Sequence, residues 1–344
     1  GRAYSEGLLN KAIERGRSTG EKAASLLSLI KPTTSYHDLA GCDLVIEAVF
    51  ESRELKADVT RKTEAVVPER CIFASNTSTL PITGLAEASQ RPAQFIGLHF
   101  FSPVDKMPLV EIILGEKTND EAIARSLDYI QQIRKTPIVV NDSRGFYTSR
   151  VFSTYTAEGI SMLAEGVKPA LIENAAKMAG MPVGPLAVTD EVTIELAWKI
   201  GKETAAAKGI DYPYDTASTA IAKMVEELDR KGKRYGKGFY DYPEDAKKHL
   251  WPGLAELAEP KPAEQFDIGE LNHRFLVIQA LEAARTVEEG VVTDPREADV
   301  GSILGFGFAP YTGGTLSYID GMGAAAFVDL CRGLEKKHGA RFRP

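Results

Sequence analysis

The stretch DLVIEAVF at residues 43–50 decides the fold, because a continuous apolar run of this length is typical of a strand buried on both faces. Four similar runs follow along the chain: CIFASNTS (71–78), FIGLHFF (95–101), LVEIILGE (109–116) and PIVVND (137–142). Helical patterns occupy 55–67 and 120–134, and an amphipathic pattern precedes them at 5–17. Strands that alternate with helices predict a mostly parallel, doubly wound sheet.

The pattern changes near residue 145, beyond which strand-like runs are absent and helical patterns dominate. These patterns cover 148–165, 168–180, 190–208, 215–228, 270–289 and 295–304. The segment 240–268 is rich in proline and charge, which is typical of a flexible linker. We therefore expect an α/β domain followed by an all-α region.

The helical region repeats itself at an offset of 124 residues. SRVFSTYTAEGISMLAEG (149–166) aligns with HRFLVIQALEAARTVEEG (273–290), and a proline-containing loop follows in both copies. We interpret the pattern as a duplication. The aligned charged residues are Arg150 with Arg274, Glu158 with Glu282 and Glu165 with Glu289. The expected boundaries are an α/β domain at 1–145, a first helical copy at 146–242, a linker at 243–268 and a second copy at 269–344.

Composition restricts the classes of partner. The 344-residue chain carries a formal net charge of −7, which argues against binding to a nucleic-acid backbone. Its three cysteines, Cys42, Cys71 and Cys331, form no CxxC pair and no metal-ligand spacing, so we expect free thiols and no metal site. No apolar run approaches the roughly eighteen residues that a membrane-spanning helix needs.

Small polar and ionisable residues gather where the predicted strands end. SNTS (75–78) closes one strand, His99 lies on the next, and Glu111 lies on the run after that. Open α/β sheets bind ligands at the carboxyl ends of their strands. If the strands of His99 and Glu111 are neighbours, the carboxylate can bind one ring nitrogen and stabilise the imidazolium that forms at the other. An isolated histidine is more often structural, so this pair alone leaves both interpretations open.

The combined string resembles the 3-hydroxyacyl-CoA dehydrogenases over nearly the whole chain. The motifs that carry the resemblance are VIEAVFE (45–51), ASNTS (74–78), GLHFFSPV (97–104), MPLVEII (107–113), TPIVVNDSRGF (136–146), GMPVGPLAVTDEV (180–192) and GKGFYDY (236–242). The linker and second helical copy are similar to the multifunctional α-subunits of bacterial and peroxisomal β-oxidation. The resemblance implies NAD-dependent oxidation of (3S)-3-hydroxyacyl-CoA to 3-oxoacyl-CoA.

The resemblance also implies residue roles by position. His99 becomes the general base on the 3-hydroxyl and Glu111 its orienting partner, while Ser78 and Ser149 lie where the family holds the substrate oxygen. The implied cofactor contacts are Glu51, Lys56, Ser78 and Arg234. The implied contacts with the CoA phosphates are Lys11 or Arg15. For Glu51 and Lys56 the alternative is helix-start electrostatics, and for Lys11 and Arg15 it is a solvated helix face.

The chain departs from the family pattern at three positions. Ser149 replaces the usual asparagine, Ser102 stands where HFFNP is common, and Arg144 replaces the proline of PGF. These changes concern substrate preference and rate more than reaction type. A larger departure is the absence of the GxGxxG turn whose backbone holds the pyrophosphate. GMGAAA (321–326) is rejected as a substitute because it falls in the second helical copy. We therefore expect a truncated Rossmann-like sheet that lacks its first β-α-β unit.

Other classes of protein fit less well. A short-chain dehydrogenase needs Tyr-x-x-x-Lys, and no tyrosine has a lysine four residues on. A hydroxyacid dehydrogenase with a catalytic lysine on its linking helix is disfavoured because 148–165 contains no lysine. A non-catalytic helical scaffold or binding fragment stays as the alternative from a different class, because half of the cofactor site is absent.

The resemblance extends to partners and assembly. It implies an acyl-CoA substrate, a fused enoyl-CoA hydratase upstream, a thiolase partner subunit, and a location in the bacterial cytoplasm or, in a eukaryote, the peroxisome. In single-copy members the helical domain pairs with its twin across a two-fold axis. We therefore expect the second copy to dock on the first as an intramolecular pseudo-dimer, with the linker as a flexible tether. This second copy is expected to be structural, without a His–Glu pair of its own.

Overall fold

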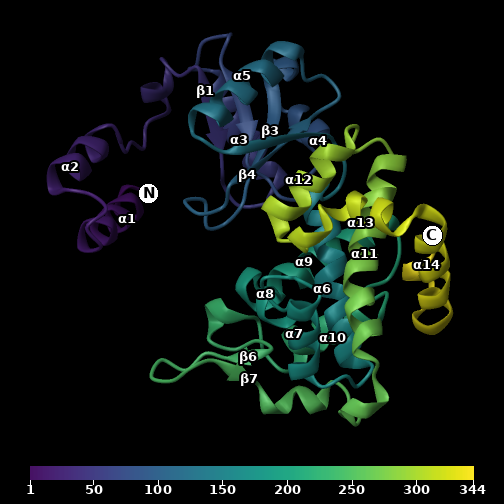
Figure 1. The fold of residues 1–344 in the computed structure, drawn as a ribbon. Coiled ribbons are helices and arrows are strands. Elements are labelled where there is room, and N and C mark those ends of the chain that lie inside the picture. Colours follow the sequence, from purple (N-terminus) through teal and green to yellow (C-terminus); the bar gives the residue numbers. More distant parts are fainter.

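The computed structural model describes residues 1–344 and combines a five-stranded sheet with a large helical region (Figure 1). The strands are β1 (Leu44–Glu47), β2 (Ile72–Ser75), β3 (Phe95–Phe100), β4 (Leu109–Leu114) and β5 (Thr136–Asn141). They lie in sequence order, and every neighbouring pair is parallel except β3 and β4, which are antiparallel. The predicted Rossmann-like parallel sheet is thus confirmed, with β1 and β5 at its edges.

The helices of this α/β region are α1 (Arg2–Glu14), α2 (Gly20–Ser28), α3 (Arg53–Glu64), α4 (Ile82–Ala86) and α5 (Asp120–Gln132), with short 3₁₀ turns η1 (Tyr36–Leu39) and η2 (Pro92–Gln94). Three of them start at side-chain caps: the Thr19 side chain accepts from Lys22 N before α2, Ser52 accepts from Leu55 N before α3, and Asn119 accepts from Ala122 N before α5. Helices α1 and α2 stand apart from the sheet, and no residue of α1 is buried (Figure 1).

The helical region after the sheet confirms the predicted change of class. Its first part contains α6 (Thr148–Ala164), α7 (Pro169–Met178), α8 (Pro185–Val192), α9 (Ile194–Lys208) and α10 (Thr216–Ala222), which continues as the π-helical turn η3 (Lys223–Glu227), then η4 (Lys233–Tyr235). Its last part contains α11 (Ile268–Glu288), α12 (Pro295–Phe306), η7 (Pro310–Thr312), α13 (Thr315–Met322), α14 (Ala324–His338) and η8 (Ala340–Phe342). GMGAAA spans the end of α13 and the start of α14, with no strand before it.

The segment between these two parts is not a flexible tether, and that expectation is wrong. It forms the hairpin β6 (Tyr240–Asp241) and β7 (His249–Leu250), then η5 (Pro252–Glu256) and η6 (Ala263–Gln265). The Trp251 ring lies 4.1 Å from the Arg230 guanidinium, Leu254 is buried, and Lys261 N donates to Gly166 O at 2.8 Å. These apolar and backbone contacts hold the segment on the first helical part.

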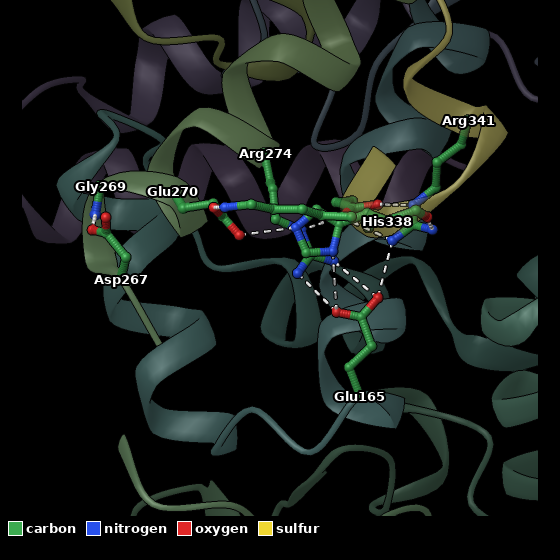
Figure 2. Close-up of polar contacts among 9 residues, drawn as sticks. Glu165, Asp267, Gly269, Glu270, Arg274, His338 and Arg341 are labelled. Atoms are coloured by element: carbon green, nitrogen blue, oxygen red, sulfur yellow. Dashed lines mark hydrogen bonds and ion pairs between the residues drawn. The ribbon is translucent and has the colours of Figure 1, made fainter. Parts of the chain in front are cut away.

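The two longest helices, α6 and α11, pack side by side in the helical region (Figure 1). Tyr155 of α6 and Phe275 of α11 are both buried and meet edge to face at 5.3 Å. Each helix also carries one arginine that binds two glutamates of the other. On one side, Arg150 binds Glu282 and Glu289 at 2.5 Å each. On the other, Arg274 binds Glu158 at 2.5 Å and Glu165 at 2.8 Å (Figure 2).

The last helical part also contacts the sheet. Asn141 at the end of β5 donates its backbone N–H to Val291 O at 2.8 Å, and Val139 N donates to the Glu297 carboxylate at 3.1 Å. These bonds cover the β5 edge, whereas β1 pairs only with β2. None of the helices combines the length and the apolar character that a membrane crossing requires.

Candidate active site

His99 and Glu111 form a buried pair at the centre of the sheet. The antiparallel register of β3 and β4 places them opposite each other, and His99 Nδ1 lies 2.9 Å from Glu111 Oε2. The histidine is 7% exposed and the glutamate 0%. His99 Nε2 makes no hydrogen bond within the chain, and the Phe101 ring packs 4.4 Å from the imidazole centroid. The carboxylate therefore orients the ring and leaves one nitrogen to exchange a proton.

The N-terminus of α6 holds the other side of the Glu111 carboxylate. Tyr147 N and Thr148 N each donate to Oε1 at 3.0 Å, and Thr148 Oγ1 donates to Oε2 at 2.6 Å. Gly145 and Phe146 have positive φ angles of 76° and 49°, which turn the chain so that the helix starts at this carboxylate. Glu111 thus supplies the cap that α6 lacks in its own sequence. Sequence reasoning missed Tyr147 and Thr148.

The SNTS segment joins this pair at the carboxyl end of β2. The Asn76 side-chain oxygen accepts from Phe100 N at 2.8 Å, which ties the segment to the residue after His99. Ser78 N donates to Glu51 Oε1 at 2.9 Å, and the Ser78 hydroxyl lies 3.4 Å from the same oxygen. The structure therefore brings Ser78 and Glu51 together at the edge where β1, β2 and β3 end.

Lys56 lies in a buried ion network beneath Glu51. Its ammonium is 2.9 Å from Glu47 Oε1 and 3.4 Å from Glu51 Oε2, and the lysine is 2% exposed. Glu47 also accepts from the Ser75 hydroxyl at 2.7 Å. A buried lysine needs such partners because an unpaired charge in the interior is costly. Sequence reasoning missed Glu47, although a carboxylate inside an otherwise apolar strand was a usable signal.

Four other predicted site residues lie outside this network. Ser149 is half-buried, and its side chain makes no hydrogen bond within the chain. Arg234 is exposed in η4, among the helices rather than at the sheet edge. Lys11 and Arg15 are exposed on and just after α1. None of these three cations forms an ion pair with another residue of the chain, so each is available to a ligand or to solvent.

The last helical part does contain a histidine–glutamate pair, and the expectation that it has none is wrong. His338 Nε2 of α14 lies 3.0 Å from Glu270 Oε1 of α11 (Figure 2). This pair differs from the one at the sheet because it belongs to a group of ion pairs between helices. Glu270 also binds Lys337, and His338 faces Glu165. No group of three or more histidine, cysteine, aspartate or glutamate side chains is arranged to hold a metal ion.

Comparison with known proteins agrees with this geometry. Residues 1–143 match "3-hydroxyacyl-CoA dehydrogenase, NAD binding domain", and residues 145–242 match "3-hydroxyacyl-CoA dehydrogenase, C-terminal domain". Over 343 residues the chain is 41% identical to the fatty acid oxidation complex subunit alpha of Shewanella amazonensis and 40% identical to that of Shewanella halifaxensis. Each match covers 99% of this chain and 48% of the relative, so the chain spans about half the length of these curated relatives.

Two solved structures are also similar. The (S)-3-hydroxybutyryl-CoA dehydrogenase PaaH1 from Ralstonia eutropha is 33% identical, with 69% of this chain and 84% of that one covered and a TM-score of 0.64. The 3-hydroxybutyryl-CoA dehydrogenase from Escherichia coli K12 is 24% identical, with coverage of 100% and 88% and a TM-score of 0.83. The second likeness shows that the fold of the whole chain has a counterpart.

A sheet of mostly parallel strands with a histidine–glutamate pair near the carboxyl end of β3, followed by a helical domain, defines a nucleotide-dependent dehydrogenase of the α/β plus all-α type. Within that class, the chain belongs to the 3-hydroxyacyl-CoA dehydrogenase family.

Proposed function

We propose that this chain carries the catalytic residues for the NAD-dependent oxidation of (3S)-3-hydroxyacyl-CoA to 3-oxoacyl-CoA, with His99 as general base. The observation that carries the proposal is the 2.9 Å contact between His99 Nδ1 and Glu111, which leaves Nε2 for the proton of the 3-hydroxyl. Glu111 orients the ring and balances the charge of the imidazolium. Bound NAD supplies the hydride acceptor. Ser78 and Ser149 hold the substrate oxygen; the Ser149 side chain is shorter than the asparagine that the family commonly has at this position.

The residues at the sheet edge fit the nicotinamide end of the cofactor. Glu51 and Ser78 are already joined by a hydrogen bond at the end of β1 and β2, and buried Lys56 holds the Glu51 carboxylate in place. Arg234 would reach the cofactor only if the helical region moved closer to the sheet. Lys11 or Arg15 would bind the CoA phosphates. These assignments rest on position in the family pattern together with the exposure of all three cations.

The remainder of the cofactor site belongs, in this proposal, to a further β-α-β unit that pairs with β1. The free edge of β1 supports it, because an unpaired edge strand is a template for another strand. The apolar side chain of Phe50, three residues after β1, supports it as well, since Phe50 is 86% exposed. Without such a unit the chain acts as a helical scaffold, which is the alternative function.

The test compares this chain with a chimera that adds the preceding β-α-β unit of a curated relative. We expect calorimetry to show weak or no NADH binding by the chain alone and clear binding by the chimera. The chimera should reduce NAD with (3S)-3-hydroxybutyryl-CoA and not with the (3R) isomer. Micromolar NADH affinity of the chain alone would contradict the shared-site proposal, whereas a chimera that binds NADH without turnover would favour the scaffold.

The reciprocal ion pairs between α6 and α11 support a further proposal, that of an internal pseudo-dimer. Arg150 and Arg274 are 124 residues apart, as are the glutamates that each of them binds. Arg150 of α6 binds Glu282 of α11, and their counterparts Arg274 of α11 and Glu158 of α6 bind each other in the reverse sense. Such reciprocal contacts are typical of two elements related by a two-fold axis. We infer that the second helical copy occupies the place that a partner subunit takes in single-copy relatives, and that the fused hydratase and the thiolase partner bind elsewhere.

A further inference from the structure

We infer that Thr148 is a positioning residue for the His99–Glu111 pair, and that Tyr147 anchors it to the last helical part. This inference rests on the proposed function, because it concerns how the proposed base is oriented. The Thr148 hydroxyl and the His99 ring share one oxygen of Glu111: Thr148 Oγ1 lies 2.6 Å from Oε2, and His99 Nδ1 lies 2.9 Å from the same atom. The hydroxyl therefore competes directly with the imidazole for the negative charge that stabilises the imidazolium.

The geometry leaves the carboxylate a single orientation. Two backbone N–H groups bind Oε1, and the threonine hydroxyl and the imidazole bind Oε2, so each oxygen has two partners. Glu111 and Thr148 are buried to 0% and 1% exposure, so water cannot replace a lost donor. A carboxylate held in this way keeps the ring of His99 fixed without rotating itself.

Tyr147 connects this corner to α12 and α13. Its side chain is fully buried, its hydroxyl donates to Ala298 O at 2.8 Å, and it lies 3.0 Å from the Thr315 hydroxyl. Burial raises the pKa of this phenol, so it stays a neutral donor. The backbone N–H of the same residue binds Glu111, which means that the last helical part sets the position of the turn that holds the carboxylate.

The charges around the pair are few. Glu111 is the only charged side chain within ion-pair distance of His99, and the aromatic rings beside the imidazole are those of Phe101 and Phe146. Asp299 of α12, whose charge acts on Tyr147, accepts hydrogen bonds from Leu316 N and from the Ser317 hydroxyl. A change in the protonation of His99 after substitution of Thr148 is therefore attributable to Glu111.

The test uses Thr148→Val, which keeps the shape and removes the hydroxyl. Without that donor the Glu111 charge is more available to the imidazolium, so the protonation of His99 should move to higher pH than in the unsubstituted chain. Glu111→Gln should move the same transition to lower pH, because the anion is lost. NMR titration of the ring, assigned with His99→Gln, measures both shifts in this chain without cofactor, so the result does not depend on activity.

Kinetics in the chimera separate positioning from folding. Thr148→Val should lower kcat by about 3- to 10-fold with little change in KM, as expected when a hydrogen bond to a charged group is lost. Thr148→Ser, which retains the hydroxyl, should restore both readouts. Thr154→Val is the matched control, since its hydroxyl binds only Val151 O of the same helix. Tyr147→Phe should shift the His99 transition in the same direction as Thr148→Val, but less.

Two results would overturn the inference. One is an unchanged His99 transition in a folded Thr148→Val chain. If Thr148→Val does not fold, the second such result is a His99 transition in Thr148→Ala at the same pH as in Thr148→Ser. Loss of all turnover in the unsubstituted chimera would count against the proposed function instead, and the titration would still decide the role of Thr148.

Discussion

At the scale of single residues, the proposed chemistry depends on one imidazole nitrogen. His99 has a partner on Nδ1 and none on Nε2, and its ring is packed by Phe101 and Phe146. The surrounding residues act on this nitrogen indirectly: Glu111 orients the ring, and the start of α6 orients Glu111. In the proposed mechanism, only a few groups touch the substrate, and the other residues of the site hold those groups in position.

His99→Gln in the chimera should lower kcat by about 10²- to 10⁴-fold, because the proton of the 3-hydroxyl then has no base. The KM for acyl-CoA should change little, since glutamine retains the volume and polarity of the ring. Steady-state NADH formation measures both constants. Full activity of this variant would remove His99 from the mechanism, and a variant that bound substrate poorly would indicate a binding role instead.

At the scale of elements, the contact between α6 and α11 joins the two helical parts of the chain through ion pairs at both ends and aromatic packing between them. Burial opposes ionisation of Glu165, but hydrogen bonds and charges from Arg274, with Arg341 and His338 beside it, outweigh burial and lower its pKa (Figure 2). A carboxyl whose pKa is lower in the folded state stabilises the fold above its unfolded pKa, and that contribution is lost as the pH falls.

The pH dependence of stability follows from the lowered pKa of Glu165. The free energy of unfolding of the unsubstituted chain should exceed that of Glu165→Gln at neutral pH, and the difference should shrink as the pH falls below 4.5, the ordinary value for this group. Urea unfolding between pH 7 and pH 3.5 measures it. Glu264→Gln, at an exposed glutamate without an ion pair, is the control and should show a difference near zero throughout. A constant difference for Glu165→Gln would contradict the interpretation.

At the scale of the whole molecule, the last helical part packs on the first and also contacts the sheet and Tyr147, as the proposed internal pseudo-dimer requires. It covers the β5 edge through Val291 and Glu297, and it anchors Tyr147 through Ala298. In the proposed pseudo-dimer both copies belong to one chain, so the contact would form at a high effective concentration and would need no second chain to bury the apolar face.

Deletion of 269–344 should convert a monomer into dimers or aggregates, because Tyr155 and its apolar neighbours on α6 lose the cover of Leu271 and Phe275. The segment 243–268 is retained in this variant, since the structure shows it packed on the first helical part. Light scattering after size-exclusion chromatography measures the mass, with the full chain as control. A shortened chain that stays monomeric and stable would show that the second copy is not a built-in partner.

The sequence by itself determined the elements, because strand and helix periodicities are local properties. The strands at 43–50, 71–78 and 95–101, the helical region after 145 and the residues His99 and Glu111 were all predictable from neighbouring residues. Their family motifs named the chemistry, and the offset of 124 residues indicated which arginines and glutamates correspond.

Only the tertiary structure decided which distant residues meet. The Thr148 hydroxyl reaches Glu111 across 37 residues and the Tyr147 hydroxyl reaches Ala298 across 151, and no local pattern encodes such pairs. The predicted linker packs on helices for the same reason, since the burial of Leu254 depends on a surface formed far away in the sequence. Glu47 is likewise defined by its partners Lys56 and Ser75. Buried polar groups are stabilised by specific three-dimensional partners, and the packing of the chain, rather than its periodicity, supplies them.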